Sequence, residues 1–471
     1  MQTSYHELKE NSPKRLWLEG GKLADAGFGK DTFYQKELDI DNRILRVVAL
    51  PNTPENVARH KRREIQKVSG RKMAGGVVKP IMDIMNADVA KLLEGTSRYC
   101  AKVRYGEIVF SIAPEEVRRI ERVKRFLKAI KRNSLDVATA FAGGGISSSA
   151  ISEGIESAGI KTNHKWLAEM EGKYLDVALA NNRERYKDTH LFIGRVQEIE
   201  TSLVEPVDVF NFSMPCTNQS KVGKAKKNIS TAEEAPESTA LFGLINLIRA
   251  SNPAVITSEN VTQARNSATY QLLRHELTRL GYTISENDLD QSQGGSLEKR
   301  KRYWFVATSK GLPKIDIANM PVTSEDNKPF KSVADILDPE EATEGMWKSI
   351  DKLQAREDKN KKAGRGFSLN KLTPASKEIG TFVRNYAKHQ VSNPHLFRND
   401  DKEYRLLNKN EHARAQLIPT RLVNYASESI AHQILGQSIN YMHGVFIGRF
   451  IGRVASLLRM HVSHYSLQMA A

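Results

Sequence analysis

A single cysteine in the middle of the chain has the setting of a nucleophile. Cys216 follows Pro215 just beyond a strand predicted at residues 207–212, and open α/β sheets place ligand-contacting residues at such strand ends. Four lysines follow within eleven residues, and nearby cations lower a thiol pKa and favour the nucleophilic thiolate. A lone cysteine is more often an inert core residue, so this segment by itself leaves both interpretations open.

Charged side chains stand at two further strand ends. Glu259, in Glu259-Asn260-Val261, ends a predicted strand, where a carboxyl group can serve as an acid or hydrogen-bond partner for a polar substrate. Arg300 and Arg302 come directly before another strand and share one side if that strand begins early. Guanidinium groups there could hold a phosphate or a base carbonyl. Solvated surface charge is the alternative for each of these residues.

A glycine-rich turn favours a nucleoside cofactor. Residues 141–145 (FAGGG) separate a predicted strand from a predicted helix, and glycines there let backbone N–H groups approach a ligand at the helix N-terminus. Glu169 ends the next predicted strand, where a carboxylate can accept hydrogen bonds from both ribose hydroxyls. A ligand-free turn beside a solvated acid is the alternative.

The elements that must position these side chains alternate between strand and helix. Strands are expected at 135–141, 163–169, 191–196, 207–212, 254–258 and 303–308, and helices at 147–158, 174–186, 240–250 and 268–280. This alternation is typical of an α/β fold with a doubly wound parallel sheet. A long apolar stripe from Ile434 to Leu457 predicts a last helix that packs back on the sheet.

The chain is expected to divide into four parts. Residues 1–134 form a basic α+β extension, with two strands within 100–112 and a helix from Pro114, and residues 135–310 form the catalytic domain. Residues 311–404 are polar and little periodic, which favours an inserted recognition region or a partly disordered connection. Residues 405–471 are helices that return to the catalytic domain.

Positive charge gathers near the N-terminus. The net charge is +16, and residues 1–134 hold 28 Lys and Arg against 17 Asp and Glu, leaving 43 against 38 for the remainder. Such a basic segment favours a polyanion, nucleic acid first, although a solvated surface is the alternative. The densest stretch, residues 59–76, is either a DNA-contacting loop or a mobile linker.

Composition excludes several classes of protein. No run of 18 apolar residues occurs, which excludes a membrane span, and the first twenty residues lack the apolar stretch of a secretory signal. Two cysteines, Cys100 and Cys216, exclude a disulfide framework and a cysteine-rich zinc module. We therefore expect a cytoplasmic monomer with no metal and no membrane partner.

Taken in order, these motifs resemble those of the C5 cytosine methyltransferase family, over about 135–308 and again over 405–459. The matching residues are Phe141, Gly143 and Gly145 of the cofactor loop F-A-G-x-G, Glu169 as the ribose-binding acid, Pro215, Cys216 and Ser220 of P-C-Q-x-x-S, Glu259-Asn260-Val261 as E-N-V, and Arg300 and Arg302 of Q-x-R-x-R. Residues 405–416 are similar to R-x-L-T-x-x-E-x-A-R-x-Q, and Gly436-Gln437-Ser438-Ile439 stands where G-N-S-V would be.

The resemblance implies a Rossmann-like DNA (cytosine-5-)-methyltransferase that uses S-adenosyl-L-methionine and double-stranded DNA. The Cys216 thiolate would attack C6 of a flipped cytosine, Glu259 would donate to N3, and Arg302 would hold O2. Arg300 belongs to the same catalytic set, and Pro215 and Ser438 join the cofactor contacts. A tRNA or RNA cytosine-5 methyltransferase and a non-catalytic DNA-binding protein with this fold are the alternatives. A restriction-modification, phage or plasmid setting, and a partner endonuclease, are left open.

The sequence departs from the family pattern at six positions. They are Thr139, Ile146, Arg195, Thr217, Glu298 and Gln437. The departures bear on cofactor contacts and local packing, whereas the nucleophile, the E-N-V acid and the two arginines are retained.

Overall fold

The computed structural model describes residues 1–9, 12–215, 231–364, 366 and 368–470. These residues form two compact units, Met1–Glu121 with Ser463–Ala471 and Arg122–Val462. The division falls earlier than the boundary expected at residue 134. Cys216 and the lysines that follow it lie outside the described residues.

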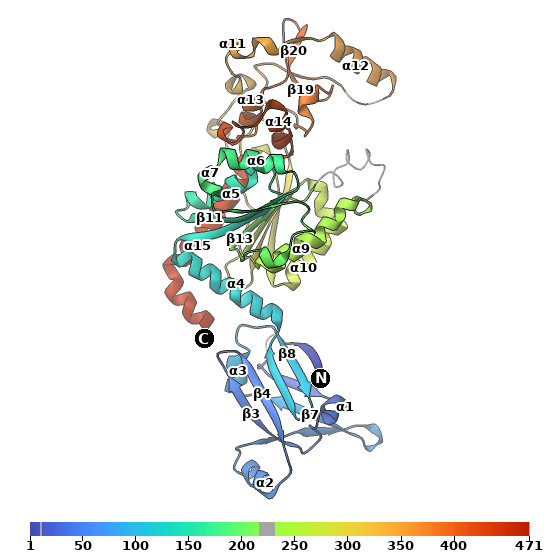
Figure 1. The fold of residues 1–471 in the computed structure, drawn as a ribbon, viewed down its shortest axis with the longest axis vertical. Coiled ribbons are helices and arrows are strands. Elements are labelled where there is room, and N and C mark those ends of the chain that lie inside the picture. The colour runs from blue at the N-terminus through green and yellow to red at the C-terminus, as the bar shows by residue number, and fades with distance from the viewer. Residues whose placement is uncertain (10–11, 216–230, 365, 367, 471) are drawn as a thin grey trace. The chain divides into compact units, whose positions relative to one another are not determined.

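A seven-stranded sheet organises the larger unit (Figure 1). Its order is β12-β11-β10-β13-β14-β16-β15. The strands are β10 (Ser134–Ala140), β11 (Lys161–Glu169), β12 (His190–Ile193), β13 (Val209–Phe212), β14 (Val255–Asn260), β15 (Tyr282–Leu289) and β16 (Arg302–Ser309). The first five are parallel, and β16 pairs antiparallel with both β14 and β15. The predicted α/β class is confirmed, but the sheet is not wholly parallel, because the strand predicted at 303–308 runs antiparallel to its neighbours.

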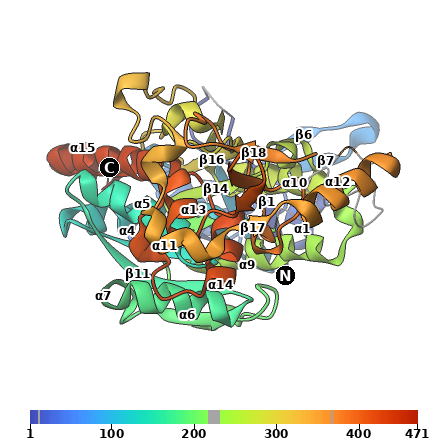
Figure 2. The same cartoon turned by 90° about the horizontal axis from the view of Figure 1, so that it is seen from above.

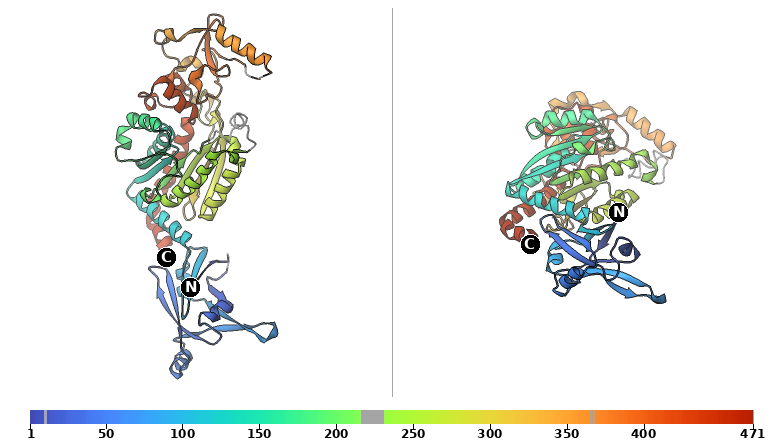
Figure 3. Two further views of the ribbon diagram at one scale, coloured as in Figure 1. Left: turned by 45° about the vertical axis from the view of Figure 1, so that its right-hand side comes forward. Right: turned by 60° about the horizontal axis from the view of Figure 1, so that its bottom comes forward.

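Helices cover both faces of this sheet (Figures 1 and 3). They are α5 (Ile146–Ser157), α6 (Gly172–Asn181), α7 (Arg183–Tyr186), α9 (Ala240–Ser251) and α10 (Ala268–Arg279). Apolar side chains of α9 and α10 share one buried core with the sheet. The single helix predicted at 174–186 is wrong, because Asn182 (φ −140°, ψ 45°) leaves the helical region between α6 and α7.

The last helix packs on α5. Helix α15 (Tyr441–Ala470) passes so close that a Cβ added to Gly154 would lie 2.1 Å from the Val445 carbonyl oxygen. On the side of the sheet, the Trp304 ring of β16 meets the His443 ring edge to face at 6.5 Å. The C-terminal helix therefore packs back on the larger unit, as predicted. Its close contacts are mainly with α5, at glycine positions. None of the helices in the described part of the chain is long and apolar enough to cross a membrane.

Residues 311–404 contain their own small sheet (Figure 2). Its strands are β17 (Lys348–Ser349), β20 (Glu403–Arg405), β19 (Pro394–Arg398) and β18 (Asn370–Leu372), in that order, beside α11 (Glu340–Thr343) and α12 (Asp351–Lys362). Helices α13 (Lys409–Ala415) and α14 (Glu428–Gln437) follow. Buried apolar residues such as Leu372, Phe382 and Leu396 give this region its own core. The described residues therefore favour an inserted folded region over a disordered connection.

The smaller unit is mainly β-structure. A six-stranded sheet has the order β1 (Gln2–Glu7), β8 (Arg98–Arg104), β9 (Glu107–Ile112), β4 (Ile44–Leu50), β3 (Phe33–Asp39) and β5 (Gln66–Lys67). A three-stranded sheet has the order β2 (Leu16–Glu19), β7 (Val78–Ile84) and β6 (Ser69–Lys72). Helices α1 (Gly21–Asp25), α2 (Pro54–Lys61) and α3 (Ala87–Leu92) belong to this unit. Helix α4 (Pro114–Lys131) begins in it and continues past Glu121, where the larger unit begins. The predicted strand pair within 100–112 and the helix from Pro114 are confirmed.

Candidate active site

The glycine turn lies directly beside the acid of the next strand. Phe141, Gly143 and Gly145 all have positive φ (55°, 54° and 74°), which folds the chain sharply between β10 and α5. The Gly143 N–H donates to Glu169 Oε2 at 2.8 Å, and the Glu171 N–H donates to Glu169 Oε1 at 3.0 Å. The structure thus brings together the expected cofactor residues of the turn and the expected ribose-binding acid.

The three glycines of this turn have different surroundings. A Cβ on Gly144 would lie 2.6 Å from the Ile434 side chain of α14, and one on Gly145 would lie 3.1 Å from Ala178. A Cβ on Gly143 would meet nothing within 4 Å. Because open space lies before Gly143 and a carboxylate and a helix N-terminus border it, this donor and acceptor set fits a nucleoside.

An acid and an arginine pair where β14 ends beside β16. Arg302 Nε lies 2.9 Å from Glu259 Oε1, and the two side chains are 14% and 7% exposed. Burial raises the pKa of the Glu259 carboxyl above its usual value, against the opposing effects of Arg302 and Arg300. The carboxyl group therefore holds its proton more readily than one in water, next to a fixed positive charge.

Asn260 ties this pair to the chain that leads to the cysteine. Its Nδ2 donates to the Met214 carbonyl oxygen at 3.0 Å and to Tyr270 Oη at 2.9 Å. Met214 is buried and the following Pro215 is exposed. Sequence reasoning matched Asn260 to a motif without assigning it a role, because its partners come from distant segments.

The cysteine itself lies outside the described residues. Strand β13, from which that chain emerges, pairs with β10 on one side and β14 on the other. Pro215 therefore leaves the sheet between the strand of the glycine turn and the strand of Glu259. The roles of Cys216 and Pro215 stay predictions.

The two arginines before β16 have different partners. The strand begins only at Arg302, so the condition for both arginines to share one side is not met. Arg300 is 1% exposed and pairs with Glu298 Oε2 at 3.1 Å. Its Nη2 donates to the carbonyl oxygens of Phe382 and Gly436, at 3.2 and 2.9 Å. Arg300 thus connects three segments of the protein, whereas Arg302 contacts the E-N-V acid.

Glu298, where the family pattern has glutamine, belongs to the same buried network. Its Oε1 accepts from the Phe382 N–H, and its Oε2 accepts from Gln416 Nε2, both at 2.8 Å. The acid and the Arg300 guanidinium neutralise each other in the interior. This departure is therefore accommodated by a complete set of local partners.

The first C-terminal motif, residues 405–416, makes buried structural contacts. Arg405 and Glu411 form a buried two-pronged pair at 2.6 and 2.8 Å, and Asn408 caps α13 in a capping box with Glu411. Ser438 is half-buried and ends α14, the helix whose Ile434 contacts the glycine turn. The proposed cofactor contact of Ser438 stays a prediction.

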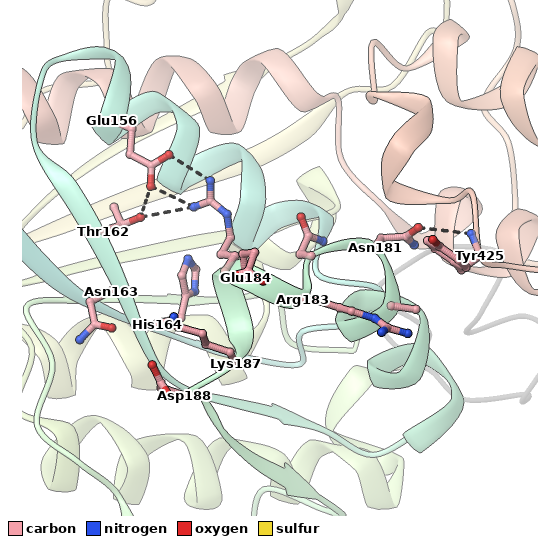
Figure 4. Close-up of a pocket in the computed structure, with 13 residues that line it drawn as sticks. Glu156, Thr162, Asn163, His164, Asn181, Arg183, Glu184, Lys187, Asp188 and Tyr425 are labelled. Carbon is pink, nitrogen blue, oxygen red and sulfur yellow. Dashed lines mark hydrogen bonds and ion pairs between the residues drawn. The ribbon is translucent and has the colours of Figure 1, made fainter.

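A hollow of the larger unit lies at the opposite edge of the sheet (Figure 4). It measures about 900 Å³ and is lined by the start of β11 and by residues between α6 and β12. Arg185 pairs there with Glu156 at 3.0 Å, and burial lowers the pKa of His164 to about 3. His164 contacts the hydroxyls of Ser148 and Ser152. None of the expected site residues lines this hollow. Within the described residues, no group of three or more His, Cys, Asp and Glu is placed to hold a metal ion.

Comparisons with known proteins agree with this arrangement. Type II methyltransferase M.MspI of Moraxella sp is 23% identical over 251 residues, covering 52% of this chain and 56% of the relative. Type II methyltransferase M1.ScrFI of Lactococcus lactis subsp. cremoris is 22% identical over 254 residues, covering 52% of this chain and 62% of the relative. The chain thus spans about three fifths of the length of these relatives.

Solved structures show the same fold. The S. pombe Dnmt2 methyltransferase has a TM-score of 0.52 at 17% identity, covering 70% of this chain and 99% of its own. The Entamoeba histolytica methyltransferase EhMeth has a TM-score of 0.53 at 15% identity, covering 69% and 99%. The family model for C-5 cytosine-specific DNA methylase matches residues 140–453, a span that begins at the glycine turn and includes Glu259, Arg302 and α14. The chain belongs to the C-5 cytosine-specific DNA methylase family.

Proposed function

We propose that this protein is a DNA (cytosine-5-)-methyltransferase that moves a methyl group from S-adenosyl-L-methionine to C5 of a flipped cytosine. The observation that carries the proposal is the buried Glu259–Arg302 pair. It lies at the end of β14, and Asn260 connects that end to Met214, two residues before Cys216. An acid with a raised pKa, a cation and a nucleophile are the groups this chemistry needs.

Cytosine C5 becomes reactive only after a nucleophile adds to the ring. The Cys216 thiolate forms a bond to C6, and the ring electrons move towards N3 and O2. Glu259 donates its proton at N3, and Arg302 holds O2, so that the charge is neutralised where it develops. C5 would then take the methyl group that bound S-adenosyl-L-methionine supplies, with S-adenosyl-L-homocysteine as the leaving group. Loss of the C5 proton to water, departure of the Cys216 sulfur as a thiolate and return of the N3 proton to Glu259 restore the aromatic base. A base inside a duplex is inaccessible, so the cytosine is flipped out of the helix.

The cofactor contacts come from the turn after β10. Glu169 would hold the ribose hydroxyls, and the backbone around Gly143 would approach the ligand across the open space in front of that residue. Phe141, Pro215 and Ser438 would complete the contacts. When bound, S-adenosyl-L-methionine supplies an electrophilic methyl group.

Arg300 acts as a positioning residue in this proposal. Its contacts with Glu298, Phe382 and Gly436 hold the segment that leads into β16, and so place Arg302. Sequence choice is assigned to residues 311–404, and residues 405–471 close the catalytic domain. The enzyme would act in the cytoplasm, as a monomer on double-stranded DNA.

A methyl-transfer assay tests the activity directly. The full chain is incubated with labelled S-adenosyl-L-methionine and either duplex DNA or tRNA. We expect label on cytosine C5 of DNA. Label on tRNA alone would replace DNA with RNA as the substrate, and no label on either would leave a binding protein with this fold.

A covalent trap tests the nucleophile. DNA with 5-fluorocytosine at the target cannot lose fluorine as a cation, so the enzyme should remain attached after methyl transfer. We expect an adduct that survives denaturation, requires the cofactor and maps to Cys216. Cys216→Ala should abolish adduct and turnover. Cys100→Ala is the matched control, because Cys100 is buried in β8 and burial raises the pKa of its thiol. An adduct on Cys100 would overturn the mechanism.

A further inference from the structure

The net positive charge of residues 1–121 comes from one segment. Residues 59–79 contain eight Lys and Arg and one acid, Glu64, whereas the remainder of residues 1–121 contains 14 Lys and Arg and 16 Asp and Glu. The unit is therefore slightly acidic apart from this segment. The basic segment comprises the end of α2, strand β5 and the β6–β7 hairpin as far as Lys79. The end of a helix and paired strands are regular structure, which does not fit the alternative of a mobile linker.

Four cations of the basic segment have no ion pair within the part of the chain that the structure describes. Arg59 and Arg62 pair with Glu64, Lys67 pairs with Asp31, and Lys79 pairs with Glu19. The remaining four are Lys61, Arg63, Arg71 and Lys72, and all four are exposed. Such cations are the groups that can neutralise phosphates of a partner.

The outer end of the β6–β7 hairpin is a two-stranded ribbon, because β2 pairs with β7 only over Ile81–Ile84 (Figure 1). All four residues of β6, Ser69–Lys72, are exposed. The turn closes with the Met73 N–H donating to the Val77 carbonyl oxygen, and these two side chains are 47% and 66% exposed. A two-stranded ribbon of this kind fits the major groove of B-form DNA.

One acid lies beside two cations of the hairpin. Arg71 lies directly opposite Lys79, and Glu19 pairs with Lys79. Both cations lower the pKa of the Glu19 carboxyl. Because one acid faces two cations, the hairpin keeps a net positive charge that a phosphate can neutralise.

We propose that the basic segment, residues 59–79, binds the phosphate backbone of duplex DNA through Lys61, Arg63, Arg71 and Lys72. This inference rests on the proposed function, in which duplex DNA is the substrate. The basic segment adds affinity that does not depend on sequence, because phosphate contacts carry no base information. Sequence choice stays with residues 311–404.

Salt dependence of binding measures the number of phosphate contacts. The full chain is titrated with a duplex that contains only A·T pairs and so lacks a target cytosine. The titrations run from about 50 to about 200 mM salt at constant pH, where counterion release makes the affinity strongly dependent on salt. The test variant carries Lys61→Gln, Arg63→Gln, Arg71→Gln and Lys72→Gln. If all four cations contact phosphates, the slope of log affinity against log salt falls by about 3.6, at about 0.9 for each contact.

A matched control separates contact from net charge. Lys9→Gln, Lys22→Gln, Lys91→Gln and Lys102→Gln remove the same charge from exposed positions of the same unit outside the basic segment. We expect the control slope to match that of the wild type. Equal slopes for the test variant and the wild type, or an equal fall in test and control variants, would overturn the inference. A slope change with tRNA but not with the duplex would overturn the choice of partner.

Methylation of target DNA keeps this test independent of the proposed function. At low salt and saturating DNA, the test variant should methylate as the wild type does, with an unchanged thermal midpoint. A wild type that transfers no methyl group would refute the proposed function. A wild type that methylates, together with a test variant of unaltered slope, would refute only the role of the basic segment.

Discussion

The two edges of the central sheet carry the same kinds of charged groups and use them differently. At the carboxyl edge, Glu259 pairs with Arg302 beside the chain that leads to Cys216. At the amino edge, Asp208 is fully buried and lies 3.5 Å from Arg125 of α4. Burial raises the pKa of both acids, and that of Asp208 reaches about 6.

The partners of the amino-edge groups are parts of the protein. Arg125 Nη2 donates to the carbonyl oxygens of Val207 and Asn252, both at 2.5 Å. Arg122 donates to Ser309 Oγ at 2.8 Å and to the Leu280 carbonyl oxygen at 2.7 Å. These contacts hold the end of α4 on the sheet. Two of the arginines counted in the positive charge of residues 1–134 therefore have a structural role.

A raised pKa therefore does not distinguish a reactive acid from a structural one. What distinguishes Glu259 is its place at the carboxyl ends of parallel strands, where the chains leave the sheet and an open space lies before Gly143. Four experiments test this difference between the edges.

The largest effect is expected from exchanging the two acids separately. Glu259→Gln should lower kcat about 10²- to 10⁴-fold, because it removes a proton donor from the reacting base. Asp208→Asn, the matched change at the amino edge, should leave kcat within a few-fold when assayed well below its thermal midpoint. Steady-state methyl transfer measures both. A comparable loss in both variants would mean that the edges do not differ in chemistry.

The second effect is on stability and belongs to the amino edge. Arg122→Met should lower the free energy of unfolding by about 4 kcal/mol, because it leaves buried carbonyl oxygens without donors at about 1–3 kcal/mol each. Lys128→Met changes an exposed residue of the same helix and should stay within about 0.5 kcal/mol of the wild type. Urea unfolding gives both values. If Arg122→Met instead lowers kcat without loss of stability, the structural assignment fails.

The third effect is a pH dependence carried by Asp208. Its pKa rises on folding from 3.8 to about 6, mainly through burial. Between these values the unfolded chain has lost a proton that the folded chain still binds, so stability falls as pH rises and then levels off above about pH 6. The contribution lost is up to about 3 kcal/mol.

Unfolding measured from pH 4 to 7 in wild type and Asp208→Asn isolates this term. The wild type should lose stability relative to the variant between about pH 4 and pH 6, with a constant difference above that window. A difference that is constant throughout would show that Asp208 titrates normally in the folded protein.

The smallest effect is expected at the hollow of the amino edge. Arg183→Ala and Lys187→Ala alter its exposed cations and should change the affinity for S-adenosyl-L-methionine by less than about twofold, since each is a surface substitution. Glu169→Gln, at the carboxyl edge, should weaken it about tenfold, as expected for a lost charged hydrogen bond. Calorimetric titration compares the three variants. Weaker binding in the hollow variants alone would move the cofactor site to the amino edge.

Much of the fold was predictable from local patterns. Strands at 135–141, 207–212 and 303–308 are confirmed within one or two residues, because each is a short, buried run bounded by polar or turn residues. Strand β15 was missed, since Tyr282–Leu289 is mostly half-buried and has no apolar run to mark it. The break at Asn182 was missed for a related reason, because helical periodicity continues across it.

The candidate site was predictable in its order but not in its connections. The glycine turn follows a strand, and Glu169 and Glu259 lie at the carboxyl ends of two others. Because parallel strands end at one edge of the sheet, the proximity of these groups follows from chain direction. The separation of Arg300 from Arg302 had no local signal. Arg300 and Arg302 have different partners because only Arg302 falls within β16.

The sequence by itself determined which residue types stand at the ends of which strands, the α/β class of the fold and the concentration of charge in the N-terminal segment. These properties follow from periodicity and composition over a few neighbouring residues. Only the tertiary structure decided that Arg302 meets Glu259 while Arg300 meets Glu298, that Asn260 holds the Met214 segment, and that Arg122 and Arg125 support α4. Those pairings join residues far apart in the chain, and several carbonyl oxygens and carboxylates could have satisfied each donor. Packing selected one of them.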